Sequence, residues 1–371
     1  MRVSSEIKNL IPYKPGKPIS ETQREYGLSK IIKLASNENP LGPSPKAIEA
    51  IKSHLENLHR YPDPLGFELV QKIASAWKVS PTHLALGNGS NEIIDLLIRI
   101  YCEPGEKILT TDKAFVAYPI CAQAARVETV KVPLNDDFTM DLAAMADLAL
   151  KDPKIRLVFL PNPNNPTGTY VGKQAIASFM EKVGKRPDLL IVFDEAYNEF
   201  VRAADYASGQ EWMKDYSSVV VMRTFSKVYG LAGLRLGAII AQQEVIDLYH
   251  RVRNPFNTNE LAQVAAIAAL DDDSYLKKSQ KVIWDGLDQI YQGLKELDLT
   301  YLPSQANFVL FDTKREAQQV YEQLLRKGLI LRPVGNYGLP HHLRWTVGLE
   351  DENQAILEAL KEVLVKVPAL R

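Results

Sequence analysis

Cysteine is scarce in this sequence of 371 residues, which contains only Cys102 and Cys121. The two do not form a C-x-x-C pair, so the sequence indicates neither a zinc site nor a disulfide framework. We therefore expect no bound metal. Reduced thiols in a cytoplasmic protein are the simplest interpretation of these two residues.

Long apolar runs and an excess of one charge are also absent. No apolar run is long enough to cross a bilayer, and residues 1–18 contain no apolar core of signal-peptide length. The 44 basic and 45 acidic residues give a formal net charge of −1, so there is no global positive field to attract nucleic acid. The sequence therefore predicts neither a membrane nor a nucleic acid as partner.

Apolar runs of strand length alternate with amphipathic segments of helix length through the middle of the chain. This alternation predicts an α/β fold with a mostly parallel central sheet that is covered on both faces. The C-terminal third has fewer strands and its own helices, which predicts a smaller α+β domain. We expect a large domain over residues 31–266 and a small domain over residues 267–371. Residues 1–30 are rich in Pro and Lys, and we expect them to form an extended N-terminal arm that joins the small domain or a partner subunit.

The most informative stretch covers residues 219–237, VVVMRTFSKVYGLAGLRLG. It begins as a buried strand and then presents Lys227 at the rim of a sheet, where α/β proteins bind ligands. The lysine is surrounded by Thr224, Ser226, Gly230, Gly233, Arg235 and Gly237. A surface lysine is the simpler interpretation, but two hydroxyls and an arginine favour an anion site, and glycines let backbone approach a ligand. Such a setting suits a lysine that forms a Schiff base with a phosphate-bearing aldehyde cofactor.

A tight turn, residues 87–92, separates a short strand from an amphipathic helix. It would present backbone N–H groups and the positive end of the helix to an anion, with Ser90 or Asn91 as the helix cap. A plain turn with an N-cap is the alternative. The turn is not a P-loop because no G-K-[ST] follows, and Glu92 occupies the place of the third glycine in a dinucleotide fingerprint.

Two further strand ends carry polar groups. The loop PNPNNPTG is stiffened by its prolines and could hold the amide of Asn165 at a ligand, although a rigid turn is the alternative. The bond between Asn165 and Pro166 is a candidate cis peptide. Asp194 ends the strand in LLIVFDEAY, where an acid either caps a helix or faces a cationic group of a ligand.

Six motifs follow one another in the order found in fold-type I pyridoxal-phosphate aminotransferases: NENPLGP, GNGSNE, PNPNNPTG, FDEAY, TFSKVYGLAGLRLG and LRWTVG. The resemblance covers nearly the whole chain and implies the aspartate aminotransferase-like fold of PLP-dependent transferases. The N-terminal PYKPGKP and LASNENPLGPSP resemble histidinol-phosphate aminotransferases most. Relatives that act on aromatic amino acids share much of both segments.

The resemblance implies that pyridoxal 5'-phosphate is the cofactor. Lys227 would bind it covalently and then move the substrate proton, and Asp194 would keep the pyridine nitrogen protonated. Asn165 and Tyr197 would hydrogen-bond the phenolic oxygen of the ring. Phe115, where many relatives have Tyr, would stack on the ring without offering a hydroxyl. The phosphate would be bound by Gly89, Ser90, Asn91, Thr224, Ser226 and Arg235.

Further roles that the resemblance implies concern the substrate and a second subunit. Tyr61, in the RYPDP loop, would reach the phosphate from the other subunit, so the active unit would be a homodimer. Arg344 would bind the substrate carboxylate through a bidentate pair. Tyr13 and Asn91 would add hydrogen bonds to histidinol phosphate. Arg332, in LILRPVG at the end of a neighbouring strand, could be the second cation of the substrate site, although an ion pair with a surface acid is the alternative.

The implied reaction is transamination between L-histidinol phosphate and 2-oxoglutarate, giving imidazole-acetol phosphate and L-glutamate in histidine biosynthesis. An aromatic amino acid aminotransferase is the alternative on this scaffold, as is another PLP reaction such as decarboxylation or β-elimination. A nicotinamide oxidoreductase with Asp112 as its ribose acid would leave Lys227 and Arg235 without a role. A non-catalytic cofactor-binding or regulatory protein would need the loss of Lys227 or an added DNA-binding segment, and the sequence shows neither.

Overall fold

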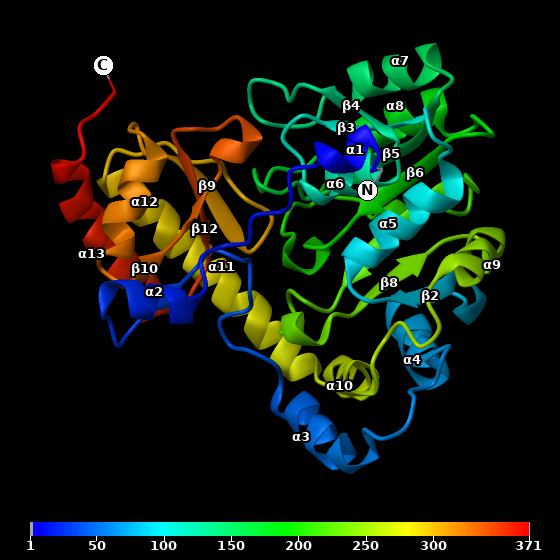
Figure 1. Ribbon diagram of the computed structural model, residues 1–371, viewed down its shortest axis with the longest axis horizontal. Coiled ribbons are helices and arrows are strands. Elements are labelled where there is room, and N and C mark those ends of the chain that lie inside the picture. The colour runs from blue at the N-terminus through cyan, green and yellow to red at the C-terminus, as the bar shows by residue number, and fades with distance from the viewer. Residues whose placement is uncertain (1–2, 371) are drawn as a thin grey trace.

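A seven-stranded sheet forms the centre of the larger part of the molecule, as seen in a computed structural model that describes residues 3–370 (Figure 1). Its strand order is β2-β8-β7-β6-β5-β3-β4. All neighbouring strands are parallel except β8, which is antiparallel to both β2 and β7. This confirms the predicted α/β fold with a mostly parallel sheet. The strands are β2 (Leu84–Gly87), β3 (Lys107–Thr111), β4 (Glu128–Val132), β5 (Ile155–Pro161), β6 (Leu190–Asp194), β7 (Val219–Thr224) and β8 (Gly237–Ile240).

Helices cover both faces of this sheet, because successive side chains of its central strands point to opposite faces. Val219 and Val221 of β7 pack with the helices of one face, and Val220 and Met222 pack with those of the other. The first face is covered by α7 (Leu142–Lys151) and α8 (Lys173–Val183). The second is covered by α5 (Ser90–Tyr101), α6 (Ala117–Ala124) and α9 (Gln243–Val252). Burial on both faces explains why the central strands are continuous apolar runs.

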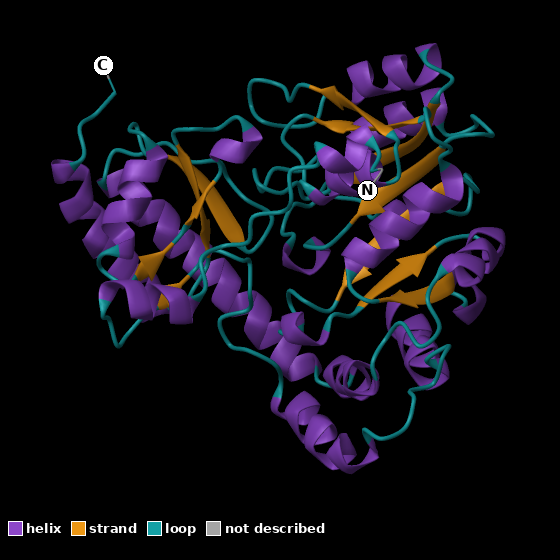
Figure 2. Cartoon of the chain, in the orientation of Figure 1, coloured by secondary structure: helices purple, strands orange, loops and turns teal. Residues whose placement is uncertain are grey.

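A second group of strands lies apart from the first and has its own helices (Figure 2). It contains an antiparallel sheet of order β11-β12-β9 and a parallel pair of β1 with β10. The strands are β1 (Ile32–Lys33), β9 (Phe308–Asp312), β10 (Leu329–Ile330), β11 (Arg332–Pro333) and β12 (His342–Thr346). The helices are α11 (Asp273–Glu296), α12 (Ala317–Leu325) and α13 (Glu350–Lys366).

The helix α11 connects these strands to a third cluster of helices (Figure 1). In that cluster α10 (Glu260–Leu270) packs against α3 (Pro45–His54) and α4 (Phe67–Trp77). Residues 3–370 contain no helix with both the length and the apolar character that crossing a membrane requires.

The N-terminal arm is not extended throughout, so that prediction was wrong in part. It contains the short helices α1 (Ser5–Lys8) and α2 (Ile19–Tyr26). The first packs against α6, where the Gln123 side chain donates a hydrogen bond of 2.8 Å to the Glu6 carbonyl. The second begins after Pro18 and ends at Gly27 in the left-handed conformation, and its Tyr26 packs against a small cluster of Ala35, Leu325 and Ile330. Prolines therefore mark the boundary of a helix here as well as extended backbone.

Candidate active site

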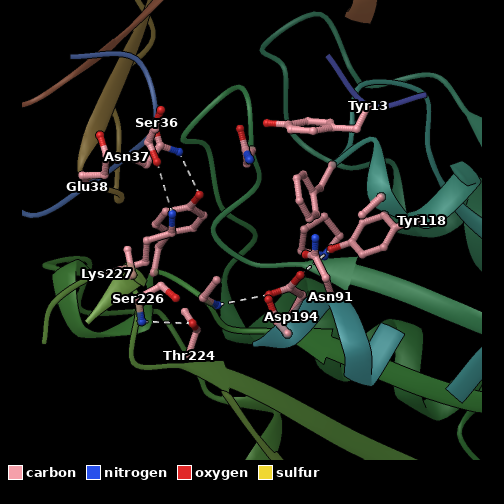
Figure 3. Close-up of a pocket in the computed structure, with 18 of the residues that line it drawn as sticks. Tyr13, Ser36, Asn37, Glu38, Asn91, Tyr118, Asp194, Thr224, Ser226 and Lys227 are labelled. Carbon is pink, nitrogen blue, oxygen red and sulfur yellow. Dashed lines mark hydrogen bonds between the residues drawn. The ribbon is translucent and has the colours of Figure 1, made fainter. Parts of the chain in front are cut away.

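A cavity of about 550 Å³ lies at the carboxyl ends of β5, β6 and β7, where α/β sheets bind ligands (Figure 3). Residues from β11, β12 and the N-terminal arm close its other side. It is lined by most of the predicted site residues: Tyr13, Ser90, Asn91, Phe115, Asn165, Asp194, Tyr197, Thr224, Ser226, Lys227, Arg235, Arg332 and Arg344. Gly89 lies one residue outside this lining, as the N-cap of α5.

Lys227 projects into this cavity three residues after the end of β7. Its Nζ lies 3.4 Å from the Ser36 carbonyl oxygen and 5.7 Å from the centre of the Tyr197 ring. Burial, together with the positive charge of Arg344, lowers the pKa of Lys227 to about 8. Near neutral pH a larger share of this amine is therefore uncharged, and only the uncharged amine can act as a nucleophile or a base.

Asp194 ends β6 and lies on the floor of the cavity, where its side chain is largely buried. Tyr118 donates a hydrogen bond of 2.6 Å to Oδ2, and the Ala196 N–H donates one of 3.2 Å to Oδ1. Burial raises the pKa of Asp194, while the Tyr118 bond opposes that rise. A buried carboxylate in this place is complementary to a cationic group of a ligand.

Tyr118 was not among the predicted site residues. Its ring is fully buried, stacks on Phe159 with centroids 4.6 Å apart and meets the edge of Phe115. The sequence offered one signal, since Phe115, just before α6, and Tyr118, in its first turn, are three residues apart, a spacing that brings helical side chains to one face.

The first turn of α5 leaves its backbone N–H groups uncovered. Gly89 is the N-cap, with φ of 74°, and no side chain caps the helix, so the prediction of a cap at Ser90 or Asn91 was wrong. The reason is that the helix already begins at Ser90, so the cap position falls on Gly89, which has no side chain. Glu92 accepts a hydrogen bond of 2.7 Å from the Asn88 N–H, which lies before the helix. The positive end of α5 is therefore open toward the cavity.

Arg235 lies beside this turn. A Cβ atom on Gly89 would fall 2.5 Å from Nη2 of Arg235, so any other residue here would force the guanidinium away from the turn. Thr224 and Ser226 line the cavity next to it, and the Ser226 N–H donates to the Thr224 hydroxyl at 3.1 Å. A cation, a helix N-terminus and two hydroxyls together form an anion site.

The loop 161–168 contains two cis peptides, Asn162–Pro163 and Asn165–Pro166. The second confirms the prediction, and the first was not predicted. The Asn165 side-chain oxygen accepts a hydrogen bond of 2.5 Å from Nη1 of Arg344. This hydrogen bond links the loop after β5 to β12.

Arg344 is buried at the other side of the cavity. Its Nη2 donates to the Ala35 carbonyl at 2.8 Å, and within residues 3–370 its buried Nε has no hydrogen-bond partner. Burial lowers the pKa of Arg344. Burying a cation is costly unless an anion pairs with it, so this residue favours a carboxylate or phosphate in the cavity.

Arg332 of β11 lies directly opposite Arg344 of β12 in the antiparallel register. Its Nη2 donates to the Lys14 carbonyl at 2.7 Å, and its guanidinium carbon lies 5.9 Å from the centre of the Tyr13 ring. Within residues 3–370 it forms no ion pair with an acid. These contacts bring Tyr13 of the arm to the cavity, where Tyr337 from the short helix Gly335–Tyr337 also lies and was not predicted.

The segment Ser36-Asn37-Glu38 also lines the cavity and was not assigned a role by the sequence. Asn37 donates a hydrogen bond of 2.8 Å to the Tyr197 hydroxyl (Figure 3). Tyr61, in contrast, lies outside this chain's cavity. Its ring is 80% exposed and stacks on Phe256 with centroids 4.6 Å apart.

Comparison with known proteins agrees with this geometry. A family profile described as "Aminotransferase class I and II" matches residues 29–360. The histidinol-phosphate aminotransferase of Bdellovibrio bacteriovorus is 56% identical over the full length of both chains. A crystal structure of histidinol-phosphate aminotransferase from Sinorhizobium meliloti in complex with pyridoxal-5'-phosphate superposes with a TM-score of 0.89, at 27% identity and 98% coverage of both chains.

The fold is shared more widely than these sequences. Aspartate aminotransferase from Thermus thermophilus, at 21% identity, superposes with a TM-score of 0.83 over 98% of this chain and 100% of that one. The predicted aspartate aminotransferase-like fold is thereby confirmed. The chain belongs to the class I and II aminotransferases, and pyridoxal 5'-phosphate is its cofactor.

Proposed function

We propose that this enzyme transfers the amino group of L-histidinol phosphate to 2-oxoglutarate, giving imidazole-acetol phosphate and L-glutamate for histidine biosynthesis. The observation that carries the proposal is the pair of arginines, Arg332 and Arg344, on adjacent strands of one cavity. A transaminase must accept two partners in turn at one site. Glutamate presents two carboxylates and histidinol phosphate presents a phosphate and an imidazole, so cations at two positions can serve both.

The cavity's donor set fits pyridoxal phosphate. Its phosphate would be held by the anion site: Gly89, Ser90, Asn91, Thr224, Ser226 and Arg235. Asp194 would pair with the ring nitrogen, Phe115 would lie against the ring, and Asn165 and Tyr197 would contact its phenolic oxygen. When bound, the cofactor supplies an aldehyde that accepts the amino group and a ring that takes up the electrons released at the substrate Cα.

The side chains of the protein move one proton and hold the substrate at two of its groups. Lys227 Nζ removes the proton from the substrate Cα, a role that its pKa of about 8 favours near neutral pH. Arg344 holds the α-carboxylate of glutamate, and its positive charge contributes to the lowered pKa of Lys227. Arg332, with Tyr13 and Asn91, holds the side-chain carboxylate of glutamate or the phosphate of histidinol phosphate.

We propose further that the enzyme is a cytoplasmic homodimer. Exposed apolar side chains gather between the end of α3 and the first residue of α4: Leu55, Leu58, Tyr61, Leu65 and Phe67. The exposed Phe256 stacks on Tyr61. Such a patch favours a protein interface, and a two-fold interface would bring Tyr61 to the partner's phosphate site. Both cysteines are free thiols, as is usual in a reducing compartment.

The test compares two amino acceptors with glutamate as donor. With the purified holoenzyme, imidazole-acetol phosphate should be preferred over phenylpyruvate in kcat/KM. Arg332→Ala should remove most of that preference, by a factor of about 10 to 100, because a charge-assisted hydrogen bond to phosphate is lost. The exposed Arg326, at the C-terminal end of α12, provides a matched control, Arg326→Ala, which should keep the preference. A strong preference of the wild type for phenylpyruvate would contradict the proposed substrate.

A further inference from the structure

Asn37, the first residue of the motif NENPLGP, is a buried polar residue with an uncommon backbone conformation. Asn37 is almost fully buried and has left-handed backbone, with φ of 56°, between β1 and α3. All of its polar groups are used. Its backbone N–H donates to the Thr346 hydroxyl at 2.9 Å, and its carbonyl accepts from the Asn307 amide at 3.1 Å. The left-handed backbone is thus held by Thr346 of β12, the strand that carries Arg344, and by Asn307 just before β9.

The side-chain amide of Asn37 has a defined orientation. The Thr346 hydroxyl accepts from the Asn37 backbone and donates to Asn37 Oδ1 at 3.1 Å. This leaves Asn37 Nδ2 to donate to the Tyr197 hydroxyl oxygen at 2.8 Å (Figure 3). In the flipped orientation the Thr346 hydroxyl would meet two N–H donors, and its own hydrogen would lose its acceptor.

This chain of bonds fixes the direction of the Tyr197 hydroxyl. Because the phenol oxygen accepts a hydrogen from Asn37, its own hydrogen points elsewhere, and Tyr197 lines the cavity. Within residues 3–370 that hydrogen has no protein acceptor. Burial raises the pKa of Tyr197 to about 12, so the phenol remains protonated and able to donate near neutral pH.

We propose that Asn37 is a positioning residue that makes Tyr197 a hydrogen-bond donor to the cofactor's phenolic oxygen. Thr346 sets the orientation of the Asn37 amide, and the amide sets the orientation of the hydroxyl. This inference rests on the proposed role of Tyr197. A hydrogen bond donated to the phenolic oxygen withdraws negative charge from it, so the nearby linkage between Lys227 and the cofactor holds its proton less tightly.

The experiment measures, in the holoenzyme, the pH midpoint at which the cofactor's visible absorption changes. Tyr197→Phe should raise the midpoint by about one pH unit, because a hydrogen bond to a charged oxygen is lost. Asn37→Asp should raise it by a similar amount, since the new carboxylate has only acceptors and takes the Tyr197 hydrogen. Thr346→Val should produce a smaller shift in the same direction, and Thr346→Ser, which keeps the hydroxyl, should restore the wild-type midpoint.

A double variant separates the effect of the Tyr197 hydroxyl's orientation from the direct effect of the carboxylate charge at position 37. If the carboxylate acts through the hydroxyl, Tyr197→Phe combined with Asn37→Asp should titrate like Tyr197→Phe alone. The control is Asn353→Asp, at a buried asparagine outside the cavity, which should keep the wild-type midpoint even if its melting temperature falls.

Two results would overturn the proposal while leaving Tyr197 in its role. One is that Tyr197→Phe shifts the pH midpoint while Asn37→Asp leaves it unchanged. The other is a shift from Asn37→Asp that persists in full in the Tyr197→Phe background. If Tyr197→Phe itself causes no shift, the proposed role of Tyr197 fails, and this inference fails with it.

Discussion

Single residues of the cavity act through hydrogen bonds to residues far away in the chain. Tyr118 and Asp194 are 76 residues apart, and Asn37 and Tyr197 are 160 apart. The sequence predicted Asp194 and Tyr197 because their motifs follow buried strands and match a known family. It did not predict their partners, since a hydrogen bond between distant segments depends on a fold that no local pattern specifies.

Tyr118→Phe should reveal how much Asp194 depends on its partner. The lost donor should raise the pKa of Asp194 further, because burial already raises it and Tyr118 opposes that effect. Asp194 must be ionised to pair with a protonated ring nitrogen, so the acid limb of the pH profile of kcat/KM should move to higher pH by about one unit. Tyr101→Phe, a part-buried tyrosine outside the cavity, should leave the profile in place. An unmoved acid limb in Tyr118→Phe would mean that this bond only supports packing.

Whole elements of the large sheet were easier to predict than those of the arm. The strands β5, β6 and β7 lie between two layers of helices, so their apolar runs are continuous and recognisable. The helix α2 is mostly polar, and its position depends on the burial of Thr22 and on the packing of Tyr26 against the cluster of Ala35, Leu325 and Ile330. Such tertiary contacts cannot be derived from a sequence rich in Pro and Lys.

The second prediction concerns a single element, the N-terminus of α5 at Gly89. Gly89→Ala places a Cβ against Arg235 in a backbone region that only glycine adopts readily, so the anion site should distort. We expect the Kd for pyridoxal phosphate, measured by spectroscopic titration of the cofactor-free protein, to rise by about 10-fold or more.

Gly105→Ala is the matched control for this change. Gly105 also has positive φ, but a Cβ atom added there would meet no atom within 4 Å, so this substitution introduces the backbone strain alone. It should lower the melting temperature and leave the Kd for the cofactor unchanged. Equal losses of cofactor affinity in both variants would show that strain, and not the contact with Arg235, governs binding.

At the scale of the whole molecule, the division into residues 31–266 and 267–371 with the arm stays a prediction, and so does the dimer. The pair Leu58→Glu and Phe67→Glu introduces charge into the exposed apolar patch. If the patch is the dimer interface, sedimentation should show monomers, and activity should fall because Tyr61 no longer reaches the partner's site. Val365→Glu, at an apolar residue of α13 that is 87% exposed, should remain a dimer. Dimers of full activity in the double variant would place the interface elsewhere.

The most direct test of the proposed reaction is its first half. The purified enzyme, loaded with pyridoxal phosphate, is mixed with L-histidinol phosphate alone, and its visible absorption spectrum is recorded. We predict that the cofactor band converts to that of the amino form within a single turnover, that imidazole-acetol phosphate is released, and that 2-oxoglutarate restores the original band. Lys227→Ala should show no conversion on this time scale, because the base at Cα is missing. A wild-type spectrum that L-histidinol phosphate leaves unchanged, while phenylalanine converts it, would contradict the account.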